Sequence, residues 1–285
     1  MIGREGKTIV VFGATGKQGG AVIDALEDGP TAWHVKAVTR DAGSANARAL
    51  AARKVTLVAG DMDDVTGLTN AMEGAEGVFS VQANFENDHD GREIRFGQNV
   101  VNAARKAGVS HLVYGSVGGA ERDTGVPHFV SKRQIERHLI ESGVPFTILR
   151  PASFMDNFAS FAMRIVLLSM FKTIMSPHTK LQLVATKDIG RFAARAFEHP
   201  TSHRGRQIEL AGDALTVPEI IRTLRQGGVK PTFALRLPSF VVGKLPADFP
   251  IMVQWFEDQG FNADIDALRG DDPQLMTLAD WTEAR

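Results

Sequence analysis

The amino-acid sequence predicts an α/β fold in which a doubly wound Rossmann-type parallel sheet is followed by a small C-terminal α/β lobe. Three observations support this prediction. Short β-branched runs alternate with helical segments through the first half of the chain. A glycine-rich turn follows the first of these runs, and 285 residues are enough for one large domain and a smaller lobe. We expect residues 1–150 to form an NAD(P)-binding Rossmann domain and residues 151–285 a lobe for a substrate or a partner, partly interleaved with the first domain.

The strands of the first half are predicted by short runs of apolar and β-branched residues. These runs are Thr8–Phe12, His34–Thr39, Val55–Ala59, Gly77–Val81, His111–Tyr114 and Pro145–Leu149. Capping residues and amphipathic or alanine-rich patterns predict the helices between these strands. One predicted helix is capped by Asp63 or Asp64 and continues through Met72. The others are Gly20–Glu27, Ala45–Arg53, Arg92–Ala107 and Phe129–Glu141. This alternation predicts parallel strands with helices on both faces of the sheet.

The pattern weakens after Pro151. Thr216 and Glu219 have the spacing of a capping box, which predicts a helix over Thr216–Arg225, and a second helix is expected over Thr277–Ala284. An apolar stripe at helical spacing is expected to form core or the wall of a pocket, or, if exposed, a docking surface. The stripe consists of Phe154, Phe158, Phe161, Ile165 and Leu168.

Composition excludes several classes of function. Lys and Arg number 32 and Asp and Glu 33, so the chain lacks the positive charge that nonspecific nucleic-acid binding requires. Cysteine is absent, which excludes disulfides, thiolate nucleophiles and cysteine-ligated metals. The histidines have no metal-ligand spacing, so no metal site is expected. Met1–Lys7 does not resemble a signal peptide, and the most membrane-like uncharged run, Ile165–Phe171, is too short to span a bilayer. We expect a cytoplasmic monomer or homodimer.

The glycine-rich turn predicts a site for a dinucleotide. Gly13 permits a tight turn, Gly16 lets the backbone approach a pyrophosphate, and Gly19 lets the helix lie close to the first strand. The start of the helix offers free N–H groups and partial positive charge to the anion. The alternative is a tight turn without a ligand.

Arg40 favours NADP over NAD as that dinucleotide. It ends the predicted second strand, where an acidic residue would bind the ribose hydroxyls and a basic residue pairs with a 2′-phosphate. The alternative is a solvated charge beside Asp41, and Asp41 keeps NAD possible.

Several motifs in order resemble those of the NmrA-like family, atypical members of the short-chain dehydrogenase/reductase superfamily. They are VFGATGKQGG, VTRD, VAGDMDD, SVQANF, HFVSK and RPASFMDNF, with WFEDQGFNADID and TLADW near the end. The resemblance covers nearly the whole chain and implies an NADP-binding Rossmann domain with a small substrate lobe.

The resemblance also implies a role for each matching position. The phosphates would be lined by Gly13, Thr15, Gly16, Lys17, Gln18 and Gly19. Arg40 would hold the 2′-phosphate, and Asp61 and Met62 would flank the adenine. The nicotinamide ribose would be approached by Gln82, Ala83 and Asn84 and bound by Lys132, and the segment from Phe154 to Asn157 would close over the nicotinamide end.

The usual catalytic tyrosine of this superfamily is missing. Such enzymes place a Tyr four residues before the Lys, but here His128 stands four residues before Lys132, and the one tyrosine is Tyr114 on the predicted fifth strand. His128 is a candidate proton donor, or else a residue that only caps or precedes the helix. Ser116 is a candidate for polarising the substrate, or else a turn residue, and Lys132 could also be a solvated helix charge.

Two functions follow. The first is an NADP(H)-responsive regulator, in which cofactor binding changes a contact with a protein partner. The alternative is an NADPH-dependent oxidoreductase for a quinone or a small carbonyl or unsaturated compound. Loss of the tyrosine is more tolerable in quinone reduction than in ketone reduction.

Overall fold

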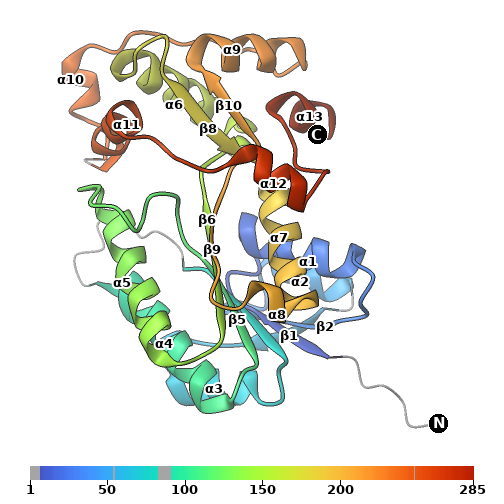
Figure 1. The fold of residues 1–285 in the computed structure, drawn as a ribbon. Helices are drawn as coiled ribbons and strands as arrows, with labels where there is room; N and C mark the ends of the chain where they lie inside the picture. The colour runs from blue at the N-terminus through green and yellow to red at the C-terminus, as the bar shows by residue number, and fades with distance from the viewer. Residues whose placement is uncertain (1–6, 54, 83–90, 247) are drawn as a thin grey trace. The chain divides into compact units, whose positions relative to one another are not determined.

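The structure is a computed structural model that describes residues 7–53, 55–82, 91–246 and 248–285. The chain divides into two compact units (Figure 1). The first unit consists of Met1–Ser116, Ser131–Leu149 and Ile189–Ile208, and the second of Val117–Val130, Arg150–Asp188 and Glu209–Arg285. The chain therefore passes from one unit to the other five times, and each unit contains segments from both halves of the sequence.

The first unit is built on a seven-stranded sheet with the strand order β3-β2-β1-β4-β5-β6-β9. The strands are β1 (Thr8–Val11), β2 (His34–Thr39), β3 (Thr56–Ala59), β4 (Gly77–Ser80), β5 (His111–Gly115), β6 (Phe146–Pro151) and β9 (Gln207–Leu210). From β3 to β6 the neighbouring strands are parallel. The order β3-β2-β1-β4-β5-β6 is that of the dinucleotide-binding Rossmann fold, so the predicted fold class is confirmed.

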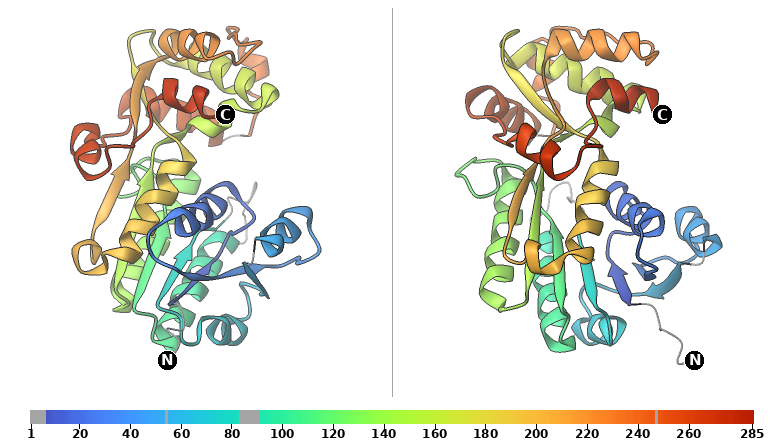
Figure 2. Two further views of the ribbon diagram at one scale, coloured as in Figure 1. Left: turned by 90° about the vertical axis from the view of Figure 1, so that its right-hand side faces the viewer. Right: turned by 45° about the vertical axis from the view of Figure 1, so that its right-hand side comes forward.

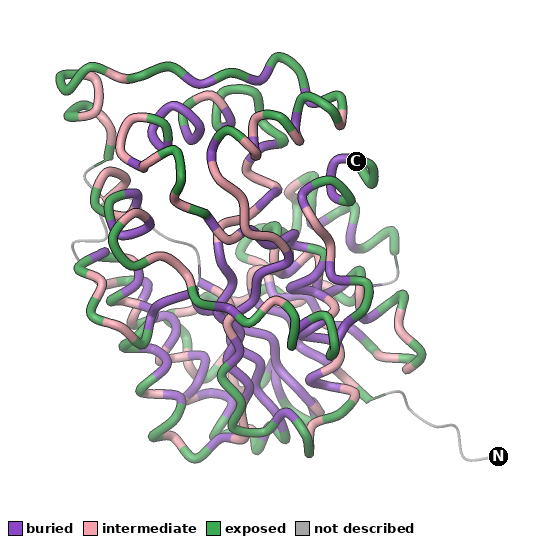
Figure 3. Tube along the Cα trace, turned by 45° about the horizontal axis from the view of Figure 1, so that its top comes forward, coloured by how far each residue is buried: buried purple, intermediate pink, exposed green. Residues whose placement is uncertain are grey.

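Helices cover both faces of this sheet (Figures 1 and 2). One face carries α3 (Val65–Met72), α4 (Arg92–Ala107) and α5 (Pro127–Ser142), whose buried side chains share a core with the strands. The other face carries α1 (Lys17–Asp28) and α7 (Thr186–Glu198), with α2 (Ala45–Ala52) and α8 (Pro200–His203) nearby. The strands between these two layers are largely buried (Figure 3).

The second unit is built around a three-stranded sheet with the order β10-β8-β7. β7 (Ser153–Phe154) is parallel to β8 (Lys180–Val184), and β10 (Asp213–Thr216) is antiparallel to it. The helices are η1 (Met155–Phe158), α6 (Phe161–Ile174), α9 (Val217–Gln226), α10 (Ser239–Val242), α11 (Asp248–Asp258), α12 (Ile265–Asp271) and α13 (Leu278–Glu283). Aromatic side chains of α6, α11 and α13 form much of its core. Among the described residues, no helix combines the length and the apolar character needed to cross a membrane.

Of two sequence predictions for the second half of the chain, the capping box is confirmed and the apolar stripe is not. The capping box is confirmed, because Thr216 and Glu219 exchange hydrogen bonds at the start of α9. The prediction of one apolar stripe at helical spacing is wrong. Ser160 caps a new helix after η1, so Phe158 and Leu168 are buried on separate helices while Phe161 is 53% exposed.

Candidate dinucleotide site

The turn between β1 and α1 depends on glycine at two positions. Gly13 has a φ of +65°, and a Cβ there would lie 2.6 Å from Cγ1 of Val81. A Cβ on Gly19 would lie 2.3 Å from the carbonyl oxygen of Gly13, which real side chains do not permit. The first turn of α1 therefore packs directly on the backbone of the loop, as the sequence predicts for a pyrophosphate-binding turn.

The start of α1 is open to an anion. Its N-cap residue is Gly16, no side chain caps the helix, and its first turn contains no acidic residue. Thr15, Gly16 and Lys17 are exposed. The partial positive charge of a helix start favours a phosphate at such a place. The glycine-rich backbone therefore fits the diphosphate of a dinucleotide.

Arg40 is available to a phosphate. It is exposed directly after β2, and its guanidinium makes no hydrogen bond or ion pair with any described residue. The carboxylate of the neighbouring Asp41 already has a hydrogen-bond partner, because its Oδ1 accepts a hydrogen bond from the Gly43 amide at 2.8 Å. Asp41 thus shapes the turn before α2 rather than pairing with Arg40.

The loop after β3 is fixed by its own polar groups. Oδ1 of Asp61 accepts from the Asp63 amide at 2.9 Å, and the carbonyl of Met62 accepts from Nδ2 of Asn99 at 2.9 Å. The side chain of Met62 packs on the core of the first unit. Asp64, one of the two expected candidates, caps α3. The proposed adenine contacts of Asp61 and Met62 stay predictions.

Two buried polar groups follow the central strands. Gln82 is 3% exposed, and its Nε2 donates to Oγ of Ser80 at 2.9 Å. Its Oε1, like the buried Oγ of Ser116, has no hydrogen-bond partner among the described residues. Ligands of parallel α/β sheets bind at the carboxyl ends of the strands, where these two residues lie. Ala83 and Asn84 lie outside the described residues.

Lys132 is not a solvated helix charge. It is 7% exposed, and its Nζ lies 2.8 Å from Oε1 of Glu93, a residue of α4 that is 2% exposed. The hydroxyl of Ser131 donates to Oε2 of the same carboxylate. Lys132 is therefore one half of a buried ion pair, and sequence reasoning missed its partner.

Tyr114 does not replace the missing catalytic tyrosine. Its side chain is wholly buried on β5, and its hydroxyl has no hydrogen-bond partner among the described residues. Burial, reinforced by the carboxylates of Glu93 and Glu136, raises the pKa of the Tyr114 phenol well above its usual range. The Nζ of Lys132 lies 5.9 Å from the centre of its ring. Tyr114 thus supports the buried lysine and is a poor proton-transfer group.

Three predicted site residues belong to the second unit. His128 lies in the first turn of α5, with its Nδ1 3.9 Å from Oδ2 of Asp248, too far for a hydrogen bond. Phe154 in β7 and Asn157 in η1 are both half-buried. Their roles toward a cofactor or a substrate stay predictions.

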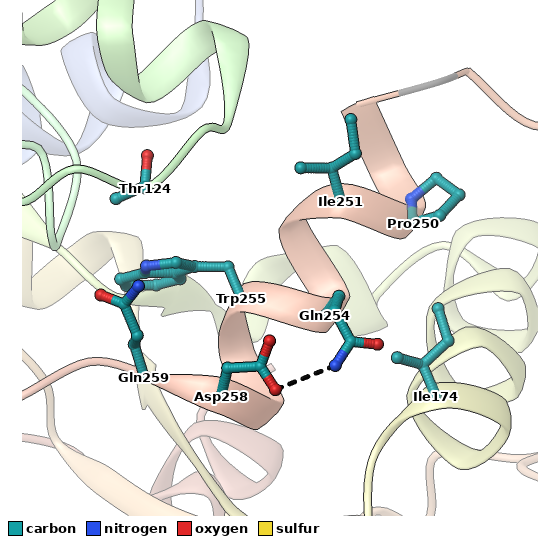
Figure 4. A pocket seen from close by; sticks show the side chains of 8 residues that line it. All are labelled: Thr124, Ile174, Pro250, Ile251, Gln254, Trp255, Asp258 and Gln259. Carbon is teal, nitrogen blue, oxygen red and sulfur yellow. Dashed lines mark hydrogen bonds between the residues drawn. The ribbon is translucent and has the colours of Figure 1, made fainter.

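The second unit contains a cavity of about 450 Å³ (Figure 4). It is lined by Thr124, Ile174, Pro250, Ile251, Gln254, Trp255, Asp258 and Gln259. Most of these residues belong to α11, and Nε2 of Gln254 donates to Oδ1 of Asp258 at 2.9 Å. The volume and the mixture of apolar and amide side chains suit a small organic molecule. The WFEDQGF segment contributes Trp255, Asp258 and Gln259 to this cavity, and its sequence pattern alone predicts no such role.

Comparisons with known proteins agree with this geometry. The family model of the NmrA-like family matches residues 5–282. Quinone oxidoreductase 2 from Escherichia coli (strain K12) is 30% identical over 228 residues, which are 79% of this chain and 76% of that protein.

Two solved structures share the fold over almost the whole chain. The NADPH-dependent quinone oxidoreductase from Escherichia coli, crystallised with NADPH, has a TM-score of 0.77 and 25% identity, covering 97% of this chain and 99% of the other. NmrA, a negative transcriptional regulator, has a TM-score of 0.78 and 20% identity, covering 98% of this chain and 95% of the other.

Proposed function

Because the chain belongs to the NmrA-like family, we propose that it binds NADP(H) and reduces a small planar acceptor of the quinone type. The observation that carries the reductase half of this proposal is the cavity of about 450 Å³ in the second unit. A protein that only senses the cofactor has no need of a separate cavity for a small organic molecule. The relative named for quinone reduction and the solved structure that holds NADPH support the same choice.

The cofactor half of the proposal rests on the first unit. The backbone between Gly13 and Gly19, with the start of α1, would hold the diphosphate. The guanidinium of Arg40, which has no partner among the described residues, would bind the 2′-phosphate, and the ammonium of Lys132 would donate to the ribose hydroxyls. NADPH, when bound, supplies a hydride to an acceptor.

The absence of a catalytic tyrosine is compatible with a quinone substrate. One hydride and one proton convert a quinone into a hydroquinone. The anion formed by hydride addition is a phenolate, which is far less basic than an alkoxide, so water can supply the proton without a buried acid. Ketone reduction would need a proton donor that Tyr114, with its raised pKa, does not provide.

Stopped-flow absorbance of NADPH mixed with a panel of quinones and ketones tests this function. We expect NADPH oxidation with quinones and slow or no oxidation with ketones. Ile251→Trp should narrow the cavity and raise KM for the quinone, whereas Leu235→Trp changes an exposed residue of the same unit away from the cavity lining and should not. An unchanged NADPH signal with every quinone would refute the proposal.

A regulator is the second candidate, and the missing tyrosine favours it, since a sensor needs no proton donor. The solved structure of a negative transcriptional regulator shares the fold. In this case saturating NADPH should change the oligomeric state or the affinity for a protein partner, as measured by light scattering or by pull-down from the native cell. Quinone turnover without any such change would favour the reductase.

A further inference from the structure

We propose that Glu93 is the positioning residue for Lys132, holding its ammonium in one place so that it can bind the cofactor ribose. The inference rests on the proposed function, because it concerns the same cofactor site. It adds a residue on a different helix that neither the motifs nor the spacing around Lys132 indicates.

The contacts engage the carboxylate at both oxygens. Oε1 of Glu93 forms an ion pair with Nζ of Lys132 at 2.8 Å, without the angles of a hydrogen bond, and Oε2 accepts from the hydroxyl of Ser131, the residue just before Lys132. Together the two contacts restrain the carboxylate. Glu93 therefore connects the first turn of α4 to two successive residues of α5.

The position of Glu93 stabilises its negative charge. It lies in the first turn of α4, where the partial positive charge of the helix start favours a carboxylate. It is also 2% exposed, so water cannot screen its attraction to the ammonium. A charged pair is thus maintained where a lone charge of either sign would be unfavourable.

Lys132 needs this partner because it is itself buried. A buried ammonium without a counter-charge is unfavourable, because burial removes its hydration and nothing replaces it. Glu136 follows one turn further along α5, and the ring of Tyr114 on β5 has its centre 5.9 Å from Nζ. Among the described residues, Nζ forms its ion pair with Glu93, and the Tyr114 ring lies near the outer limit for a cation–π contact.

A double-mutant cycle on the full chain tests the inference, with NADPH affinity measured by calorimetry. Glu93→Gln and Lys132→Gln should each weaken NADPH binding about tenfold, the scale of one charge-assisted hydrogen bond. Glu93→Gln in the Lys132→Gln background should have no further effect, because Glu93 acts through Lys132. Glu136→Gln removes the same charge from the same buried region and should leave the affinity within about twofold.

A cofactor fragment separates positioning from a merely structural role. 2′-phospho-ADP lacks the nicotinamide ribose, so Glu93→Gln should bind this fragment as wild type does while it binds NADPH about tenfold more weakly, whereas a general structural defect would weaken both. If Glu93→Gln does not fold, Glu93→Asp keeps the charge, withdraws the carboxylate by one methylene and should still weaken NADPH binding.

The outcomes distinguish the inference from the proposed function. Wild-type protein that does not bind NADPH would overturn the proposed function. Normal binding by Lys132→Gln would overturn the role of the lysine, and with it that of Glu93. Weak NADPH binding by Lys132→Gln with normal NADPH binding by Glu93→Gln would overturn the inference alone, as would equal losses in Glu93→Gln and Glu136→Gln.

Discussion

The two units differ in how their candidate sites are assembled. In the first unit, the glycine turn is a single continuous segment between β1 and α1, and Arg40 directly follows the neighbouring strand. In the second unit, the cavity is lined by Thr124, Ile174 and residues of α11, which come from three distant parts of the chain. A site built from one turn has a local sequence signature, whereas a cavity between packed elements has none.

The same contrast holds for the cores. The first unit is ordered by parallel strand pairs whose apolar runs are visible in the sequence. The second relies on contacts between aromatic side chains, such as Trp255 with Phe129 and Phe261 at ring distances of 5.2 and 5.3 Å. Substitutions that act through local backbone should therefore have their largest effects in the first unit.

Gly19→Ala is expected to cause the largest loss of stability. Its Cβ would lie 2.3 Å from a backbone oxygen, so α1 must move away from the loop, at a cost of about 3 kcal/mol. Gly20→Ala is the matched control: its Cβ would lie 3.7 Å from the Ala14 carbonyl, and alanine favours a helix by about 0.5–1 kcal/mol. Urea unfolding and NADPH calorimetry measure both variants. Equal stability of the two would show that α1 does not pack on the loop as described.

Acid should destabilise the first unit through His111. Burial, with the positive charges of Arg204 and His203, lowers the pKa of His111 to about 4. The His111 imidazole therefore binds a proton below about pH 6.5 in the unfolded chain, but only below about pH 4 in the folded chain. Stability should be full above about pH 7 and fall by about 2 kcal/mol on going to about pH 5.

A comparison of wild type with one histidine variant isolates this effect. In His111→Gln the fall in stability between about pH 7 and about pH 5 should be smaller than in wild type. Parallel pH profiles for wild type and His111→Gln would contradict the assignment.

Much of the first unit could be predicted because its signals are local. The strand His34–Thr39 and the helix Arg92–Ala107 have the predicted bounds. β9 could not be predicted, since its four residues pair at the edge of the sheet only after the chain has returned from the second unit. Position in a sheet is a property of the whole fold, and a four-residue strand carries too little pattern to reveal it.

The residues of the candidate sites also fall into two groups, those with a local sequence signal and those without one. Gly13, Gly19 and Arg40 were recognisable because the strand–turn–helix context gives each a physical role. The burial of Lys132 was not, because its partner Glu93 belongs to another helix and a Lys in a helix is usually solvated. Trp255 was missed as a cavity residue because aromatic residues in helices usually form core, and only packing shows which of them border a cavity.

Arg40→Ala should have an intermediate effect that is confined to the phosphorylated cofactors. Loss of one charge-assisted contact should weaken NADPH and NADP binding by about tenfold, about 1.4 kcal/mol. NADH and NAD lack the 2′-phosphate and should bind as they do to wild type. Calorimetric titration with all four nucleotides measures the difference, and an equal loss for all four would show that Arg40 does not recognise the phosphate.

Thr216→Ala should have the smallest effect, and it tests whether the second unit can be weakened alone. The variant loses the capping box of α9, worth about 1 kcal/mol. In a Trp33→Phe background, fluorescence reports Trp255 and Trp281 of the second unit, so the urea midpoint of that signal should fall while NADPH affinity stays unchanged. Ser160→Ala removes a single cap bond, from the Met163 amide, rather than a capping box, and should cost less. A loss of NADPH affinity in Thr216→Ala would mean that the cofactor site depends on the packing of the second unit, and the local character assigned to the first site would be wrong.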